Sequence, residues 1–276
     1  MAISRGNQYE HAVMAQALSR IEDPTLDEES RLTLHRSKIS DQQVFDTAQR
    51  FMNNIWNVER TNPTSQQFYK SFKQLGGRSP EPKTDVLFVK NGTRYRCSMK
   101  WDDAWQLGSA GIQGSVTVMN MVLQKIAIAG GMGGGEVMRV AEILDWMGDT
   151  MDLGKLPQTQ IRPLLERGKQ QGEFQDLQRI LGSRQQPQPD RLYIAFKREF
   201  IRESLTGGNV FGVSNDRCAT HILDSTPQVS PITDAMINGM MDRVFVDIRL
   251  KNRGYLDPDT KNQPINEAVL RIEPVT

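Results

Sequence analysis

A hairpin signal between residues 85 and 100 constrains the fold more than any other segment. Residues 86–89 are strand formers, residues 94–98 alternate between apolar and polar side chains, and Asn91-Gly92 stands between the two runs. Asn-Gly tolerates the positive φ angles that a two-residue hairpin turn requires. The sequence therefore predicts an antiparallel hairpin with Asp85 at the start of one strand and Lys100 at the end of the other, both at its open end.

This acid–lysine pair has two interpretations. A carboxylate beside an ammonium group is the skeleton of a metal-dependent phosphodiesterase site, in which the acid holds the cation and the lysine faces the phosphate. Charged residues are also common at strand ends, so an ordinary surface hairpin with charged ends is an equally simple alternative.

The residues around the hairpin continue a longer pattern. The segments, in chain order, are Pro82-Lys83-Thr84-Asp85, Ser98-Met99-Lys100, Trp105 to Gly111, Arg198 to Gly207, Phe245 to Lys251 and Leu270-Arg271. Together they resemble the PD-(D/E)xK nuclease superfamily, and in particular a set of phage-encoded members with a Thr-Asp, Ser-x-Lys and Gln-Leu-x-Ser order. The resemblance covers roughly residues 80–272.

The resemblance implies an α/β fold with a restriction-endonuclease-like mixed β-sheet flanked by helices. Residues 1–78 are expected to form an N-terminal helical part that packs on the core. Residues 79–156 and 190–276 would form the nuclease-like core, and residues 157–189 a helical insertion rich in Gln, Arg and Lys.

The resemblance also implies a magnesium site. Asp85 would be one ligand and the main-chain carbonyl of Met99 another, because magnesium prefers hard oxygen ligands. Glu10, on the predicted first helix, would supply a helix-borne carboxylate, although a glutamate on a helix face is often simply solvated. Lys100 would lower the pKa of the attacking water or neutralise charge on the phosphate, and Gln106 would belong to the same catalytic group.

The chain departs from the family pattern at its second acid. The usual strand motif is Asp/Glu-x-Lys, and here the acid position is Ser98. Some restriction enzymes with serine there place a glutamate fourteen residues after the lysine, and that position is Gly114. Asp102 and Asp103 follow the lysine closely and offer a substitute. With one carboxylate, the predicted site would bind magnesium poorly.

Composition limits the class of protein. The chain has 276 residues, of which 38% are hydrophobic and 24% charged, as in an ordinary globular protein with an ample core. The formal net charge is +1, so any DNA contact must be a local patch, for which Arg249 and Lys251 are candidates. Surface solvation explains these two residues equally well. Two cysteines indicate no disulfide framework, and no apolar run reaches membrane-span length.

The remaining periodicity predicts an order of helices and strands. Helices are expected at 8–22, from Ser40 to about 59, and at 64–75, 115–129, 136–147, 191–205 and 233–240. Further strands are expected near 219–223, 244–250 and 269–272, with a glycine-rich linker at 130–135 and an acidic break at 22–29.

Two functions therefore remain open. The first is a phage protein that kept a nuclease-like fold and lost catalysis, and that contacts DNA or other phage structural proteins in the virion or its assembly. The second is an active magnesium-dependent DNA endonuclease or resolvase. Either would be found in the host cytoplasm or the virion, with magnesium as cofactor only if the site is active and with no membrane partner.

Overall fold

The structure is a computed structural model, and it forms two compact units. One unit contains residues 1–105 and 205–233, and the other contains residues 106–204 and 234–276. The described residues are 4–21, 23–55, 61–62, 83–90, 93–101, 108–130, 134–151, 156–157, 167, 170, 191–226, 228–242, 244–256 and 264–274. The domain boundaries expected at 79, 157 and 190 stay a prediction.

A mixed β-sheet is the centre of the first unit. Its strands are β1 (Thr61–Asn62), β2 (Val86–Lys90), β3 (Thr93–Met99), β6 (His221–Leu223) and β7 (Val229–Pro231), in the order β1-β2-β3-β6-β7. The pair β3–β6 is parallel and the other pairs are antiparallel. The predicted hairpin is confirmed, since Val86 pairs with Cys97 and Lys90 with Thr93. The α/β class with a mixed sheet is likewise confirmed.

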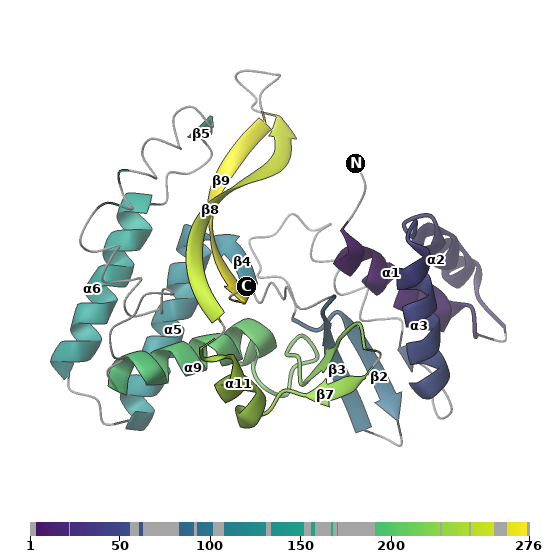
Figure 1. The fold of residues 1–276 in the computed structure, drawn as a ribbon, viewed down its shortest axis with the longest axis horizontal. Helices are drawn as coiled ribbons and strands as arrows, with labels where there is room; N and C mark the ends of the chain where they lie inside the picture. Colours follow the sequence, from purple (N-terminus) through teal and green to yellow (C-terminus); the bar gives the residue numbers. More distant parts are fainter. Residues whose placement is uncertain are drawn as a thin grey trace. The chain divides into compact units, whose positions relative to one another are not determined.

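Three helices belong to the same unit, α1 (Arg5–Leu18), α2 (Leu26–Arg36) and α3 (Gln42–Ile55). Figure 1 shows them beside β2 and β3. Apolar side chains of α1 and α3 pack with one face of the sheet because their i, i+3, i+4 spacing gives each helix an apolar stripe. The buried cluster consists of Tyr9, Ala12, Val13, Met14, Ala17, Val44, Ala48, Phe51, Met52, Val86, Phe88, Cys97, Met99 and Leu223.

The break expected at residues 22–29 is present, since α1 ends at Leu18, but the second half of this segment begins helix α2, which was not expected. Thr25 and Glu28 form a capping box: the Thr25 hydroxyl accepts from the Glu28 N–H at 3.3 Å, and the Glu28 carboxylate accepts from the Thr25 N–H at 2.8 Å. Acidic residues in the first turn also suit the positive end of the helix dipole. The acidic residues of this segment therefore favour the start of α2.

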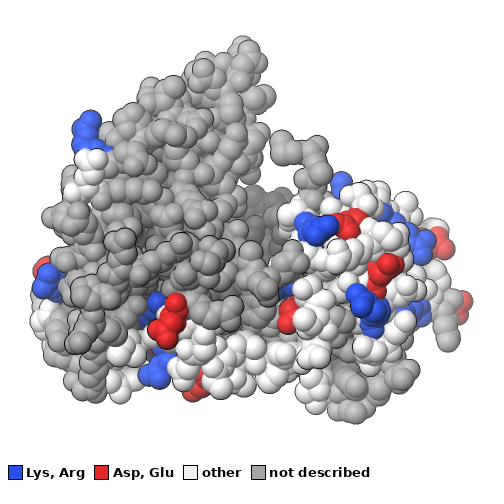
Figure 2. Space-filling model, viewed as in Figure 1, with Lys and Arg blue, Asp and Glu red and all other residues white. Residues whose placement is uncertain are grey.

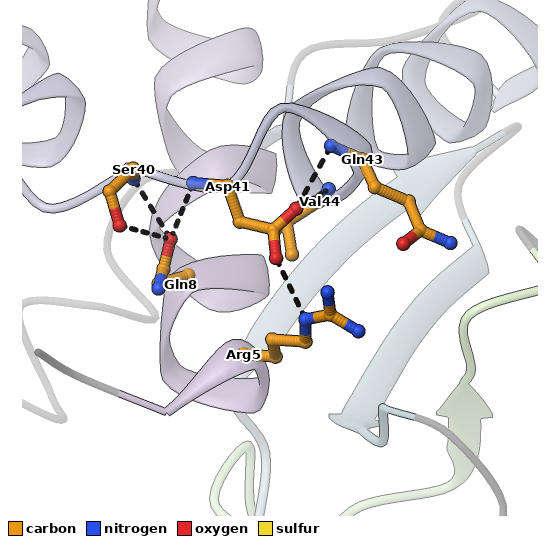
Figure 3. Close-up of polar contacts among 6 residues, drawn as sticks. All are labelled: Arg5, Gln8, Ser40, Asp41, Gln43 and Val44. Carbon is orange, nitrogen blue, oxygen red and sulfur yellow. Dashed lines mark hydrogen bonds and ion pairs between the residues drawn. The ribbon is translucent and has the colours of Figure 1, made fainter.

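Helices α1 and α3 are joined by a buried glutamine (Figure 3). The side-chain oxygen of Gln8 accepts hydrogen bonds from the N–H groups of Ser40 and Asp41 at 2.9 and 3.0 Å. The Asp41 carboxylate caps α3 by accepting from the N–H of Gln43 at 3.0 Å, and it pairs with Arg5 at 2.7 Å. The helix expected from Ser40 begins at Gln42, because the Ser40 hydroxyl turns to Gln8 and Asp41 caps the helix.

The second unit combines a β-hairpin with helices. Its elements are β4 (Gly108–Gly111), α5 (Ile112–Gly130), α6 (Gly134–Met151), β5 (Leu156–Pro157), most of α9 (Arg191–Thr206), α11 (Asp234–Met240), β8 (Val244–Leu256) and β9 (Pro264–Pro274). Strand β9 pairs with β4, β5 and β8, all antiparallel. Helices α5 and α6 lie side by side (Figure 1). The expected helices at 115–129, 136–147, 191–205 and 233–240 are confirmed, whereas β8 and β9 are longer than predicted.

Two expectations fall outside the described residues, the helix at 64–75 and almost all of the insertion at 157–189. Within the described part of the chain, none of the helices has the length and apolar character needed to cross a bilayer.

The joint between α1 and α3 gives a test of the fold. Gln8→Ala should lower the free energy of unfolding by about 1–3 kcal/mol, because two backbone N–H groups lose their acceptor. Gln42→Ala is the matched control: Gln42 is exposed and its amide donates only to Asp46, at 2.8 Å. We expect the control to change stability by less than about 0.5 kcal/mol. Urea unfolding followed by circular dichroism measures both, and equal losses would contradict a specific joint at Gln8.

Candidate functional site

The carboxylate of Asp85 is part of the hydrogen-bond ladder between β2 and β3. The Asp85 N–H donates to the carbonyl of Cys97 at 2.9 Å, as expected for an antiparallel pair. Its Oδ2 atom accepts from the N–H of Met99 at 2.6 Å and from the Ser98 hydroxyl at 3.4 Å. The Asp85 side chain therefore accepts from the next free backbone N–H of β3, that of Met99.

The backbone before Asp85 leaves the hairpin, which explains this role. The N–H groups of Lys83 and Thr84 donate to the carbonyl of Arg217, at 2.9 and 3.1 Å, and not to β3. Met99 is only 6% exposed, so its N–H needs an acceptor inside the protein. The Asp85 carboxylate supplies the oxygen that the departing backbone no longer offers.

The alternation of strand residues places the acid and the lysine on one face of the sheet. Val86 and Cys97, which pair directly, both belong to the buried cluster against α1 and α3. Asp85 and Ser98 must therefore point to the opposite face, and Lys100 follows Ser98 by two residues. The Lys100 N–H donates to the carbonyl of Leu223 at 2.8 Å, which fixes its backbone against β6. The predicted neighbourhood of Asp85 and Lys100 is thus present.

Burial dominates the electrostatics of the acid. It raises the pKa of Asp85 above the ordinary value of a carboxyl. The ammonium of Lys100, the Met99 N–H, the ammonium of Lys83 and the Ser98 hydroxyl oppose this shift, in that order, without reversing it. Burial and the nearby Asp85 charge also raise the pKa of the Cys97 thiol, so that this cysteine stays protonated and unreactive.

The end of α9 approaches the same place. Gly207 follows the helix with a φ of +67°, and a Cβ there would lie 2.9 Å from Cγ of Lys83 and 2.8 Å from the ring of Phe211. Glycine is required both for the left-handed backbone and for this close approach. The Ala219 N–H donates to the carbonyl of Thr206 at 2.9 Å and begins the turn into β6. The Thr-Gly pair singled out in the sequence is therefore a structural neighbour of the residue before Thr84.

Helix α1 covers the other side of the hairpin end. The Tyr9 hydroxyl donates to the carbonyl of Asp224 at 3.1 Å, and its ring meets that of Trp101 edge-on at 5.1 Å. Burial, and next the charge of Asp224, raise the pKa of Tyr9, so the hydroxyl remains a donor. Glu10 follows Tyr9 in α1 and is partly buried. The structure thus brings Glu10 into the same unit as Asp85.

Several other predicted residues cannot be placed beside the acid. Gln106, Asp102 and Asp103 lie outside the described residues. Gly114 lies inside α5. Arg249 and Lys251 lie in β8, where their backbones pair with Val269 and Glu267.

Sequence reasoning overlooked two features of the first unit. Asp224 follows β6 beside Lys100, but its Oδ1 atom accepts from the N–H of Thr226 at 2.9 Å and so closes a local turn. His11 of α1 and His35 of α2 face each other with 2.8 Å between their Nδ1 atoms, and His35 is completely buried. A spacing of 24 residues across two helices carries no local signal, so only the packing of α1 on α2 reveals the histidine pair.

The donor set does not fit a magnesium ion. Among the described residues, no three His, Cys, Asp or Glu side chains lie together in a way that could hold a metal. The Asp85 carboxylate already accepts an N–H and faces two ammonium groups. Magnesium needs several hard oxygens in a near-octahedral arrangement, mostly anionic or water.

Two buried polar atoms lie at the same end of the hairpin, on the face opposite to the pair. Thr84 Oγ1 and Trp101 Nε1 have no hydrogen-bond partner within the part of the chain that is described. Alternation from Val86 and Met99 puts both side chains on the α1 face. Buried polar atoms of this kind are usually satisfied by ordered water, which suits a structural joint better than a cation site.

Comparison with protein-family models, curated proteins and solved structures finds no match for this chain.

Substitutions at Asp85 test whether its carboxylate stabilises the protein as an acceptor in the β-ladder. Asp85→Ala should lower the free energy of unfolding at neutral pH by about 1–3 kcal/mol, because the buried Met99 N–H loses its acceptor. Asp85→Asn keeps an oxygen in the same position and should cost clearly less. Thermal and urea unfolding measure both variants, and equal losses would show that the charge, not the acceptor, matters.

The same pair of proteins gives a pH test. The folded state binds the Asp85 proton more tightly than the unfolded chain, because burial raises the pKa. This contribution to stability is complete below the unfolded pKa of about 4 and is lost as pH rises through the folded pKa. The free energy of unfolding of the natural protein, minus that of Asp85→Asn, should therefore fall between about pH 4 and neutral pH. A rise would mean that Lys100 outweighs burial.

Proposed function

We propose that this is a phage protein with a PD-(D/E)xK nuclease-like fold that is catalytically impaired and that contacts DNA as a structural component of the virion or its assembly. The observation that carries the proposal is that the Asp85 carboxylate is already engaged, as an acceptor for a backbone N–H and as a partner of lysines. The Asp85 oxygen completes the β-ladder at Met99, the acid faces two lysines, and the described residues hold no group of three His, Cys, Asp or Glu side chains that could bind a metal there.

The fold supports the nuclease-like part of the proposal. A mixed sheet with helices packed on it is what the resemblance implies, and the hairpin places Asp85 and Lys100 at one end and on one face of it. The Thr206-Gly207 helix end, which belongs to the same resemblance, lies against Lys83. Three segments of the pattern thus meet in one unit although more than a hundred residues separate the first from the last.

The charges support the loss of catalysis. Asp85 contributes one negative charge at most, and Lys83 and Lys100 contribute two positive ones. Asp224, which follows β6 beside Lys100, offsets only one of these positive charges. A divalent cation would therefore find no net negative charge among these four side chains, whereas a hydrolytic metal site provides one. Burial adds to the difficulty because it favours the protonated acid.

DNA contact through a local surface fits the charge distribution better than a broad electrostatic attraction. The formal net charge is only +1. Figure 2 shows basic and acidic residues interspersed over the described surface on the face that it draws. Non-specific DNA binders use a continuous basic face, so a contact here must rest on a few well-placed cations.

The alternative is an active magnesium-dependent DNA endonuclease or resolvase. It is favoured by one observation, the electrostatic coupling of Asp85 with Lys100 on the same face of the sheet. An active enzyme would need further acids from residues such as Asp102 and Asp103. Supercoiled plasmid distinguishes the two functions, because nicking that disappears in Asp85→Asn and Lys100→Ala would establish the enzyme.

We expect supercoiled plasmid to remain intact after incubation with the purified protein and either Mg²⁺ or Mn²⁺, because the site lacks the negative charge to hold the ion. Agarose electrophoresis with a competent endonuclease as positive control measures this. Metal-dependent nicking by the natural protein would overturn the proposed impairment.

Restoring the missing acid tests whether only the charge was lost. Ser98→Asp places a second carboxylate next to Asp85, since the Ser98 hydroxyl lies 3.4 Å from its Oδ2. With about 10 mM MgCl₂, at ten times a millimolar Kd, the variant should gain about 1.4 kcal/mol and a Tm higher by about 3–6 °C. The natural protein and the uncharged control Ser98→Asn should not respond relative to NaCl of equal ionic strength. A Tm shift in the natural protein would show that it already binds the ion.

A further inference from the structure

An open surface depression, called the cavity below, lies beside the hairpin and is separate from the acid–lysine pair. It has a volume of about 530 Å³ and is lined by Arg94 of β3 and by Ser214 to Arg217 of the loop after α10 (Gly208–Phe211). Its described lining contains two guanidinium groups and the carboxylate of Asp216, and no aromatic ring. A space of this size accommodates a nucleotide-sized group or a short stretch of a polymer backbone.

The loop that forms most of the wall is held in place by backbone contacts. The guanidinium of Arg96 donates to the carbonyls of Val213 and Asn215, the first at 2.8 Å. The Asn215 side chain accepts from the N–H of Arg217 at 3.0 Å, and the Arg217 carbonyl accepts from Lys83 and Thr84. The wall is therefore positioned before any ligand arrives, which reduces the entropy lost on binding.

The two arginines that line the cavity differ from solvated surface cations. The Arg217 guanidinium lies over the ring of Phe211, 6.0 Å from its centroid. Arg94 is paired with Asp216, and the two side chains are 51% and 35% exposed. An ion pair this exposed is weak, so an anion of higher charge can take the place of Asp216 beside Arg94.

From these contacts we infer that the cavity binds phosphate groups. Planar guanidinium groups match the oxygen pairs of phosphate, and two of them in one cavity suit a ligand with repeated phosphates. The lack of aromatic lining in the described wall argues against base stacking and for contact with the backbone alone. A nucleic-acid strand is the source that we favour, and this choice of source rests on the proposed function.

The cavity also lies on the face of β3 that carries the acid–lysine pair. Arg94, Arg96, Ser98 and Lys100 alternate along one strand, so they share a face. Six residues at about 3.3 Å each put Arg94 about 20 Å from Lys100.

The test uses the full chain and two probes. Inorganic phosphate is titrated into ¹⁵N-labelled protein, and a fluorescein-labelled single-stranded oligonucleotide is titrated by anisotropy at several salt concentrations. The variants are Arg94→Gln, Arg217→Gln and the double variant Arg94→Gln with Asp216→Asn, which leaves no carboxylate unpaired. Arg5→Gln is the matched control, because Arg5 is 52% exposed and paired with Asp41 just as Arg94 is paired with Asp216.

We expect phosphate to shift the amide resonances of residues 214–217, and we expect each cavity variant to weaken oligonucleotide binding by about threefold or more. Each lost contact should also reduce the slope of log Kd against log salt by about 0.7. Arg5→Gln should bind as the natural protein does. If the cavity variants behave as Arg5→Gln does with both probes, the inference is overturned.

Two further outcomes separate the possible ligands. Phosphate shifts at 214–217 without oligonucleotide binding would support the phosphate subsite and reject nucleic acid as its source, whatever the plasmid assay shows. Displacement of the oligonucleotide by a poly-glutamate peptide at equal charge concentration would overturn the preference for phosphate. Plasmid nicking alone would contradict the proposed loss of catalysis and leave the cavity result as measured.

Discussion

The parallel pairing of β3 with β6 is the contact on which the first unit depends. It joins Cys97 to His221 and Met99 to Leu223, residues that lie more than 120 positions apart in the chain. Closing so long a loop is entropically costly, and the loss is recovered only when the pairing buries apolar surface. Cys97, Met99 and Leu223 do this by entering the cluster beneath α1 and α3. The same pairing delivers the loop at 207–218 to the open end of the hairpin.

Asp85 shows how a residue typical of catalysis can be occupied by structure. At the point where the backbone turns toward Arg217, β3 still presents the buried N–H of Met99. A carboxylate in this position completes the ladder, and Lys83 and Lys100 balance its charge. A metal would have to compete with these contacts, and the described residues offer no group of three His, Cys, Asp or Glu side chains to hold it. The contacts of Asp85 are thus complete within the fold. Their most direct effect is on the stability of the protein and not on enzymatic turnover.

The sequence predicts the local elements of this fold well and the long-range ones poorly. Asn91-Gly92 between two strand-like runs is a local rule, and the hairpin that it predicts has the expected register. The capping residues Thr25 and Glu28 obey an equally local rule. The acidic composition of the segment hides this helix start. The short strand β7 carries no clear periodicity, since its three residues Val229–Pro231 form a strand only because β6 offers an edge.

The candidate site divides in the same way. The neighbourhood of Asp85 and Lys100 follows from hairpin geometry alone. The hydrogen bond from the Met99 N–H to Asp85 does not follow from it, because this bond depends on where the backbone before Asp85 turns. Nothing local in the sequence joins Arg94 with Asp216, or Arg96 with the carbonyls of residues 213 and 215, since more than a hundred residues separate them.

The cavity and the acid–lysine pair lie on the same face of β3. Arg96 stands between the cavity and the acid–lysine pair, and its guanidinium is committed to the loop that forms the cavity wall. An anion in the cavity would therefore act on the loop whose Arg217 carbonyl holds Lys83 and Thr84. Under our proposal, phosphate binding would act on the geometry at Asp85 through the segment 207–217, which includes α10.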